Sequence, residues 1–291
     1  MDRLFIINPK SGFRHPLRQL EDHIYSVFNE TGNNKFEIVH SDYAGHAYNL
    51  ARDASGRGVG MVVAAGGDGT MNEVCSALVN TQTAFGLIPM GSGNGYARSL
   101  KIPLNYKAAI QHIKDGKAGK IDVGRIDNRY FFGTAGFTLD AHISAKFDSF
   151  NHRGPLPYFY IGLREFLNYT CEDFELEFNG NRINVCPIIL TVANTSQYGN
   201  GAIIAPQADF ADGLLDICII ENQSVLDLSF RLNLLFNGKI QSMRGYKSYR
   251  TGKLKIKRSK GSGFYHLDGE SFTGGHSHEI EIIPKALTVC R

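Results

Sequence analysis

AGGDGTMN, at residues 65–72, decides the fold of this chain. The apolar run GMVVAA at 60–65 comes before it, and a segment of helical character, Thr70–Asn80, comes after it. A buried strand, a glycine turn and a helix in this order place backbone N–H groups and a helix N-terminus where a phosphate can bind. Thr70 and Glu73 fit the capping box S/T-x-x-E, which predicts a helix start at Thr70.

Asp68 is the unusual member of this glycine turn, because a carboxylate that faced a phosphate would be repelled. We therefore expect Asp68 to serve a metal ion, a reacting hydroxyl group or a hydrogen bond of the loop. A tight turn with a buried structural aspartate is the alternative, because short motifs also occur by chance. Neither the P-loop pattern nor G-x-G-x-x-G fits this stretch.

Two further segments have the same strand-to-turn character. The strand-like run Leu4–Ile7 leads into NPKSG at Asn8–Gly12, and Phe85–Ile88 leads into PMGSGNG at 89–95. If the three strands are neighbours in one parallel sheet, the three turns meet at its carboxyl edge. Open α/β sheets bind their ligands at that edge.

In order and spacing, Asn8–Gly12, Gly66–Asn72 and Gly91–Arg98 resemble the diacylglycerol kinase catalytic-domain family. This family includes bacterial lipid kinases of the diacylglycerol type and the sphingosine and ceramide kinases. ADGLLD at 211–216 is similar to its D-G-x-L-D element, and LDGE at 267–270 is similar to its late D-G-E. NAD kinases and 6-phosphofructokinases also carry G-G-D-G-T, so the order of all five segments carries the resemblance.

The chain departs from this family at GSGNG, residues 91–95, where the family commonly has G-T-G-N-D. Ser92 keeps a hydroxyl group, but Gly95 has no carboxylate, so no role of the family's acid is carried over to it. The resemblance otherwise extends from Asn8 to Glu270.

The resemblance implies a lipid kinase that depends on ATP and Mg²⁺ and phosphorylates a hydroxyl group of a membrane lipid such as diacylglycerol or a sphingoid base. Glu270 matches the family's proposed general base, and Asp68 is the second candidate catalytic residue. Asp268 is the near alternative to Glu270, because it would lie on the same side of an extended segment. An NAD kinase and a non-catalytic lipid- or nucleotide-binding protein of this fold are the rival functions.

Two sets of candidate binding residues follow from the resemblance. The nucleotide would contact Asn8, Pro9, Lys10, Ser11, Gly12, Ser41, Gly66, Gly67, Asp68, Gly69, Thr70, Met71, Asn72 and Ser92. Asp209, Asp212 and Leu214 are the candidate metal ligands. For Asp212 a plain Asp-Gly turn in front of a strand is the alternative.

The pattern of apolar residues predicts an α/β protein with two domains. Strands alternate with helices up to about Gly119, which favours a Rossmann-like parallel sheet in an ATP-binding domain, residues 1–119. Residues 120–291 read as a mainly antiparallel β domain for the lipid substrate, with the last residues packing back on the first domain. The predicted helices are Pro16–Asn29, Gly45–Ala54, Thr70–Asn80, Asn94–Leu100, Asn105–Gly116, Pro157–Tyr169 and Ser224–Phe236. The predicted strands after residue 119 are Lys120–Asp127, Tyr130–Thr134, Asp173–Phe178, Arg182–Val192, Leu214–Ile220, Lys253–Lys257 and Glu279–Ile283, with a hairpin turn at Asn179–Gly180.

The composition places few constraints on the class of protein. Apolar runs of only a few residues predict no membrane-spanning helix, and no signal peptide is expected. Five cysteines without C-x-x-C spacing predict reduced, buried thiols in a cytoplasmic protein. His276 and His278 read as part of a surface loop, not as a zinc site.

The distribution of charge is more informative than its total. A net charge of +3 does not indicate a nucleic-acid partner, but Arg244–Lys260 holds eight basic residues and no acid. Lys253, Lys255 and Lys257 should share one solvent face. That face is either a protected edge strand or a cationic surface for anionic lipids, worth about 1 kcal/mol per basic residue near a membrane. The expected location is cytoplasmic with peripheral membrane contact, and a homodimer stays an open alternative.

Overall fold

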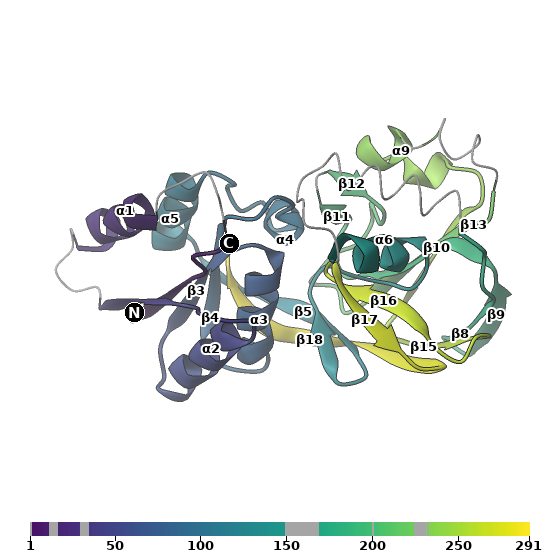
Figure 1. The fold of residues 1–291 in the computed structure, drawn as a ribbon, viewed down its shortest axis with the longest axis horizontal. Helices are drawn as coiled ribbons and strands as arrows, with labels where there is room; N and C mark the ends of the chain where they lie inside the picture. Colours follow the sequence, from purple (N-terminus) through teal and green to yellow (C-terminus); the bar gives the residue numbers. More distant parts are fainter. Residues whose placement is uncertain are drawn as a thin grey trace. The chain divides into compact units, whose positions relative to one another are not determined.

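The computed structural model describes residues 2–11, 17–29, 35–148, 169–199, 201–223, 231 and 233–291 (Figure 1). The chain divides into two compact units. The first comprises residues 1–122 together with 284–291, and the second comprises residues 123–283. The last strand therefore begins in the second unit and ends in the first.

The first unit is an α/β domain built on a parallel sheet, as the sequence predicts. Its strands are β1 (Arg3–Ile7), β2 (Phe36–His40), β3 (Met61–Gly66) and β4 (Ala84–Pro89), in the order β2-β1-β3-β4. Its helices are α1 (Leu17–Asn29), α2 (His46–Gly56), α3 (Asp68–Leu78), α4 (Gly95–Ser99) and α5 (Tyr106–Asp115). The C-terminal part of β18 (Ser277–Cys290) joins the sheet beside β4, where Val289 pairs with Phe85.

Helices cover both faces of this sheet (Figure 1). The apolar stripe of α1, formed by Leu20, Ile24, Val27 and Phe28, packs with α5 on one face. The pair α2 and α3 packs on the other face. Every residue of β3 and β4 is buried, as expected for strands covered on both sides.

The start of α3 corrects the predicted capping box. The helix begins at Asp68, after Gly67, which makes no side-chain cap hydrogen bond. The Glu73 carboxylate instead accepts hydrogen bonds from the N–H groups of Gly45 (2.8 Å) and Ala47 (3.1 Å), at the start of α2. Thr70 accepts one from Asn8. Both capping side chains are engaged by neighbouring elements, and this explains the difference.

The second unit is a β sandwich, which confirms the predicted antiparallel class. One sheet has the order β18-β15-β8-β9 with β5 and β6 attached, and the other has the order β14-β13-β10-β7-β16-β17. The strands are β5 (Ala118–Ile126), β6 (Arg129–Phe131), β7 (Thr134–Gly136), β8 (Phe174–Phe178), β9 (Asn181–Val185), β10 (Pro187–Ala193), β11 (Gln197–Gly199), β12 (Ala202–Ile203), β13 (Leu215–Glu221), β14 (Tyr246–Thr251), β15 (Lys253–Arg258), β16 (Gly263–Leu267) and β17 (Glu270–Gly274). The remaining elements are α6 (Leu139–Asp148), α9 (Asn233–Phe236) and η1 (Ile240–Ser242). Apolar side chains of both sheets, among them Leu176, Leu190 and Ile217, form one core.

Several predicted elements of this unit differ from the structure. The single strand predicted over Arg182–Val192 is two strands, β9 and β10, because they belong to different sheets. The helix α6 and the hairpin β16–β17 have no counterpart in the prediction. Asn179 and Gly180 have φ of +48° and +76° and do form the predicted hairpin turn. Residues 157–168, 224–230 and 232 of the predicted helices lie outside the described residues.

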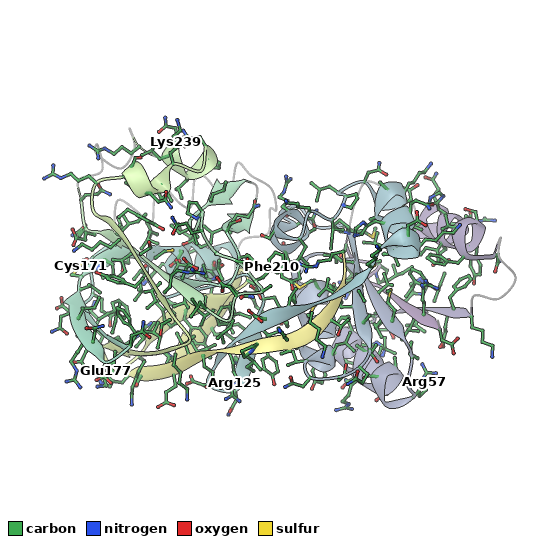
Figure 2. All side chains as sticks on the ribbon, turned by 180° about the vertical axis from the view of Figure 1, so that it is seen from behind. Arg57, Arg125, Cys171, Glu177, Phe210 and Lys239 are labelled. Carbon is green, nitrogen blue, oxygen red and sulfur yellow. A yellow bond between two sulfur atoms is a disulfide. The ribbon has the colours of Figure 1, made fainter. Side chains whose placement is uncertain are left out.

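The prediction of reduced thiols and the prediction of a surface loop at His276 and His278 each hold for only some of these residues. Cys171, labelled in Figure 2, and Cys186 form a disulfide, with Cα atoms 5.6 Å apart. Cys75, Cys218 and Cys290 are buried thiols. Cys171 precedes β8 and Cys186 follows β9, so the β8–β9 hairpin brings the pair together. His278 is buried in β18, with Nδ1 2.7 Å from the Asp127 carboxylate, and is no part of a surface loop. None of the described helices has the length and apolar character to cross a membrane.

Candidate active site

The three small-residue turns meet at the carboxyl edge of the parallel sheet, as the sequence predicts. Ile7 pairs with Ala65, and Gly66 pairs with Pro89, so β1, β3 and β4 end side by side. β2 ends beside them, and the N–H of buried Ser41 donates to the carbonyl of Ile7 at 2.9 Å. Four candidate segments of the nucleotide site therefore lie at one edge.

Asn8 joins the turn after β1 to the turn after β3 by hydrogen bonds. Its N–H donates to the carbonyl of Ala65 (2.9 Å) and its Nδ2 to Thr70 Oγ1 (2.9 Å), while its Oδ1 accepts from the N–H of Lys10 (3.0 Å). β1 and β3 are the strands between which the order β2-β1-β3-β4 changes direction. Doubly wound sheets bind ligands at such a switch point.

Glycine is required where the turns after β3 and β4 touch. A Cβ atom on Gly91 would lie 2.8 Å from the Cα of Gly67, and one on Gly66 would lie 2.6 Å from Thr70. Asn94 closes the second turn, because its side chain accepts from the N–H of Gly91 (2.9 Å) and donates to its carbonyl (2.7 Å). Asn94 is not among the candidate binding residues that the sequence suggests. Its left-handed backbone, φ +47°, is a conformation that asparagine tolerates.

The N-terminus of α3 supplies the donors of this edge. The first intrahelical bond runs from the N–H of Met71 to the carbonyl of Gly67, so the preceding N–H groups have no acceptor within the helix. Such donors, at the positive end of the helix dipole, bind anions. Asp68 lies in this first turn, and a Cβ atom on Gly93 would lie 3.3 Å from its Oδ2.

The other nucleotide candidates differ in their exposure. Pro9, Lys10 and Ser92 are exposed. Met71 is buried with its N–H used by the helix, and Asn72 accepts a hydrogen bond from Ser76 at 3.2 Å. Gly12 lies outside the described residues.

Asp209 and Asp212 form hydrogen-bonded turns in front of β13. Asp209 accepts from the N–H of Ala211 (3.0 Å), and Asp212 accepts from the N–H of Leu214 (3.0 Å) and pairs with Arg250. In the part of the chain that the structure describes, no three His, Cys, Asp or Glu side chains gather as metal ligands do. The Asp212 carboxylate is paired with Arg250 in this structure, and the assignment of Asp209, Asp212 and Leu214 as metal ligands stays a prediction.

Glu270 lies at the start of β17, directly after a two-residue hairpin turn. Asp268 and Gly269 form the turn with φ of +52° and +92°, and Leu267 pairs with Glu270 across it. The extended segment expected for Asp268 and Glu270 is therefore wrong, because the chain reverses between them. Asp-Gly is a strong signal for such a hairpin. Glu270 is exposed.

The Asp268 carboxylate holds the backbone of a neighbouring segment. Its Oδ1 accepts from the N–H groups of Gly133 (2.7 Å) and Thr134 (3.0 Å), and its Oδ2 accepts from that of Phe132 (2.9 Å). Three backbone donors favour the charged form of a carboxylate and oppose its taking up a proton. This geometry supports Glu270 over Asp268 as the candidate base.

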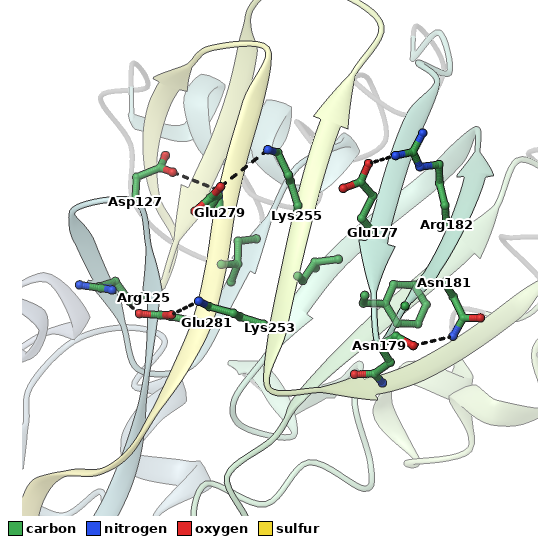
Figure 3. A pocket seen from close by; sticks show the side chains of 14 residues that line it. Arg125, Asp127, Glu177, Asn179, Asn181, Arg182, Lys253, Lys255, Glu279 and Glu281 are labelled. Carbon is green, nitrogen blue, oxygen red and sulfur yellow. Dashed lines mark hydrogen bonds and ion pairs between the residues drawn. The ribbon is translucent and has the colours of Figure 1, made fainter.

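The expected cationic face of β15 is balanced by acids. Lys253, Lys255 and Lys257 do share one face, but strands on either side supply carboxylates to it (Figure 3). Lys253 lies 3.3 Å from Glu281, and Lys255 lies 3.7 Å from Glu279. The basic residues described on this face include Arg125, Arg182, Lys253, Lys255 and Lys257. The acidic residues described there include Asp127, Glu175, Glu177, Glu279 and Glu281.

Replacing Lys253, Lys255 and Lys257 by Gln is therefore expected to leave binding to anionic vesicles unchanged and to lower Tm slightly. Neighbouring acids already neutralise the three lysines, so the lysines add little positive charge to the surface. Their loss should cost little stability, because exposed ion pairs contribute little to the free energy of unfolding. Sedimentation with vesicles rich in anionic lipid, at low salt, measures the binding. A salt-dependent loss in the variant would show that the lysines act on membranes after all.

Comparison with known proteins agrees with the geometry of this edge. Residues 2–126 match the family model of the diacylglycerol kinase catalytic domain, and residues 133–291 match that of the YegS C-terminal NAD kinase beta sandwich-like domain. The diacylglycerol kinase of Mycobacterium tuberculosis strain H37Rv is 31% identical over 294 residues, which cover 98% of this chain and 94% of that protein. The diacylglycerol kinase of Staphylococcus aureus strain MRSA252 is 27% identical over 238 residues, covering 80% and 75%.

A solved structure shows the same fold at low sequence identity. The crystal structure of a diacylglycerol kinase from Bacillus anthracis strain Sterne superposes with a TM-score of 0.75 at 17% identity, covering 99% of this chain and 96% of that one. Fold and sequence together make the protein a kinase, a transferase of phosphoryl groups. The chain belongs to the diacylglycerol kinase family, and its class of enzyme is lipid kinase.

Proposed function

We propose that the protein transfers the γ-phosphoryl group of Mg–ATP to a hydroxyl group of a membrane lipid, with diacylglycerol as the first candidate. The observation that carries this proposal is the lock between Asn8 and Thr70, which holds the N-terminus of α3 at the sheet edge. Relatives named diacylglycerol kinase that match almost the whole chain support the choice of lipid.

The chemistry asks little covalent work of the protein, because phosphoryl transfer depends on positioning and on neutralising charge. The N–H groups of the first turn of α3 would bind the phosphates of ATP. Mg²⁺ usually binds through substrate phosphates and one or two carboxylates, and Asp68 is the carboxylate at this edge. Glu270 would accept the proton of the lipid hydroxyl group.

An NAD kinase is the second candidate function, because the family model over residues 133–291 carries NAD kinase in its description. Both candidates would use the same phosphate-binding edge, and they differ in the acceptor. A lipid acceptor would bring the enzyme into peripheral contact with a membrane. We do not propose the face of β15 for that contact, because acids of the neighbouring strands neutralise its lysines.

The deciding experiment offers the purified protein Mg–ATP with a panel of acceptors in detergent micelles. Diacylglycerol, a sphingoid base, ceramide, a prenyl alcohol and NAD are tested in parallel, with a chelator in a matched set. We expect phosphorylated diacylglycerol, and we expect its formation to stop when the chelator removes the divalent cation. Phosphorylation of NAD alone would overturn the lipid proposal, and ATP binding without any product would indicate a non-catalytic protein.

A further inference from the structure

A buried polar cluster includes a histidine of the hairpin that carries Glu270. His266 of β16 and Asp140 of α6 are both buried, and His266 Nε2 lies 3.4 Å from Asp140 Oδ2. On its other side, His266 Nδ1 accepts a hydrogen bond from the N–H of Gly269 at 3.3 Å. His266 therefore connects the turn in front of Glu270 to Asp140.

The two ring nitrogens of His266 have different partners. Nδ1 accepts from the backbone N–H of Gly269, and Nε2 faces the Asp140 carboxylate. Burial raises the pKa of Asp140, but the hydrogen bond and the electrostatic attraction of His266, together with hydrogen bonds from Thr191 and Thr138, outweigh it, and the pKa lies below its ordinary value. Asp140 is thus an ionised acceptor.

Asp140 is itself held by donors from several elements. Its Oδ1 accepts from the N–H groups of Thr138 (3.1 Å) and Ala141 (2.9 Å). Its Oδ2 accepts from Thr191 Oγ1 (2.7 Å) and the Tyr198 hydroxyl (3.1 Å). Burial raises the pKa of Tyr198 well above its ordinary value, so the phenol stays a donor.

Gly136 leaves the space that the pair needs. Gly136 pairs with His266 across β7 and β16, and a Cβ atom there would overlap with Asp140 Oδ2 and His266 Nε2. Any larger residue at position 136 would push the two groups apart. Backbone and side chains together therefore hold the imidazole in one orientation.

We propose that His266 and Asp140 are positioning residues for Glu270. Asp140 orients the imidazole, and Nδ1 of His266 accepts a hydrogen bond from the N–H of Gly269. This hydrogen bond fixes the turn that immediately precedes Glu270. The proposal rests on the proposed function, in which Glu270 is the base. Small displacements of a reacting group are costly, since about 1 Å can lower a rate by about a hundredfold.

Two substitutions of His266 separate its hydrogen bond with Gly269 from its interaction with Asp140. In His266→Asn the amide oxygen lies near the place of Nδ1 and can accept from Gly269, but the side chain is too short to reach Asp140. In His266→Gln the amide can donate to Asp140 but leaves the N–H of Gly269 without its acceptor. We expect His266→Gln to lower kcat at least about tenfold and His266→Asn to lower it several-fold less.

A second buried histidine provides the matched control. His278 of β18 also bonds an aspartate, Asp127, in the same unit, and its ring lies beside Tyr265 and Gly274, away from the turn that precedes Glu270. His278→Gln should lower Tm to a similar extent as the His266 variants and leave kcat unchanged. The KM for ATP should be unchanged in all three. Thr191→Val, nearly isosteric, removes one donor to Asp140 and should lower kcat a few-fold, even if a His266 variant fails to fold.

The combination with Glu270→Gln tests the connection itself. If His266 acts through Glu270, His266→Gln adds no further loss to kcat of the Glu270→Gln enzyme. Equal losses in the Asn and Gln variants of His266, fully additive losses, or an unchanged kcat in Thr191→Val would overturn the positioning role. If Glu270→Gln alone keeps its turnover, the base assignment of the proposed function fails instead, so the two failures are distinguishable.

Discussion

Glu270→Gln is expected to lower turnover with a lipid acceptor by at least about a hundredfold, the lower end for the loss of a general base. Gln has nearly the shape of Glu and still accepts a hydrogen bond, but it takes up no proton at neutral pH. The candidate nucleotide residues belong to the first unit and Glu270 to the second. ATP affinity should therefore stay nearly unchanged, and titration with a fluorescent ATP analogue beside the lipid assay measures both quantities.

Asp268→Asn is the control for this prediction, and the structure changes what we expect from it. The amide of Asn offers only one acceptor oxygen to the N–H groups of Phe132, Gly133 and Thr134. Its NH₂ group would meet a donor, which leaves a buried partner unsatisfied. We expect a lower Tm as its main effect. A selective loss of turnover in Asp268→Asn, with Glu270→Gln near normal, would show that the base is Asp268.

The parallel sheet was predictable because its signals are local. Each of β1, β3 and β4 is a short apolar run that ends in a turn of small residues, and no distant partner has to be known to read it. The start of α3 shows the limit of local signals. Glu73 has the spacing of a capping box with Thr70, but the N–H groups of Gly45 and Ala47, far back in the sequence, take its carboxylate.

The charge on β15 shows the same limit over a longer range. Arg244–Lys260 contains no acid, so the sequence of this segment predicts a cationic face. Glu175 and Glu177 of β8 and Glu279 and Glu281 of β18 reach that face only through strand pairing. The charge of a surface depends on which residues lie close in space. A local sequence pattern does not show which distant strands pair with β15.

The candidate site divides along the same line. Asp68 and the glycine turns could be located from the sequence because each turn lies within a single strand–turn–helix segment. The pair Asp140 and His266 was not, because its members are far apart in sequence and neither belongs to a recognisable motif. The nearest signal in the sequence was the Asp-Gly dipeptide at 268–269, which marks the turn of the hairpin that contains His266.

Asp68→Asn is expected to abolish phosphoryl transfer while the protein stays folded. The amide keeps the shape of the turn but loses the charge that we assign to Mg²⁺ or to the acceptor hydroxyl group. An acidic residue in the first turn of a helix contributes only about 0.3–1 kcal/mol through the helix dipole, so the loss of stability should be small. The lipid kinase assay and thermal unfolding together test this prediction.

Glu73→Gln is the matched control, because it removes the same charge from the same helix. The Glu73 carboxylate accepts its hydrogen bonds from the start of α2, and these bonds do not join it to the three turns of the candidate site. Gln in its place keeps one of the two acceptor oxygens. We expect Glu73→Gln to lower Tm by more than Asp68→Asn does and to retain most of its turnover. Near-normal turnover in Asp68→Asn would instead mean that Asp68 serves only the turn. Equal losses of turnover in both variants would point to the total charge of α3, because a specific role of Asp68 predicts that only one of the two carboxylates matters.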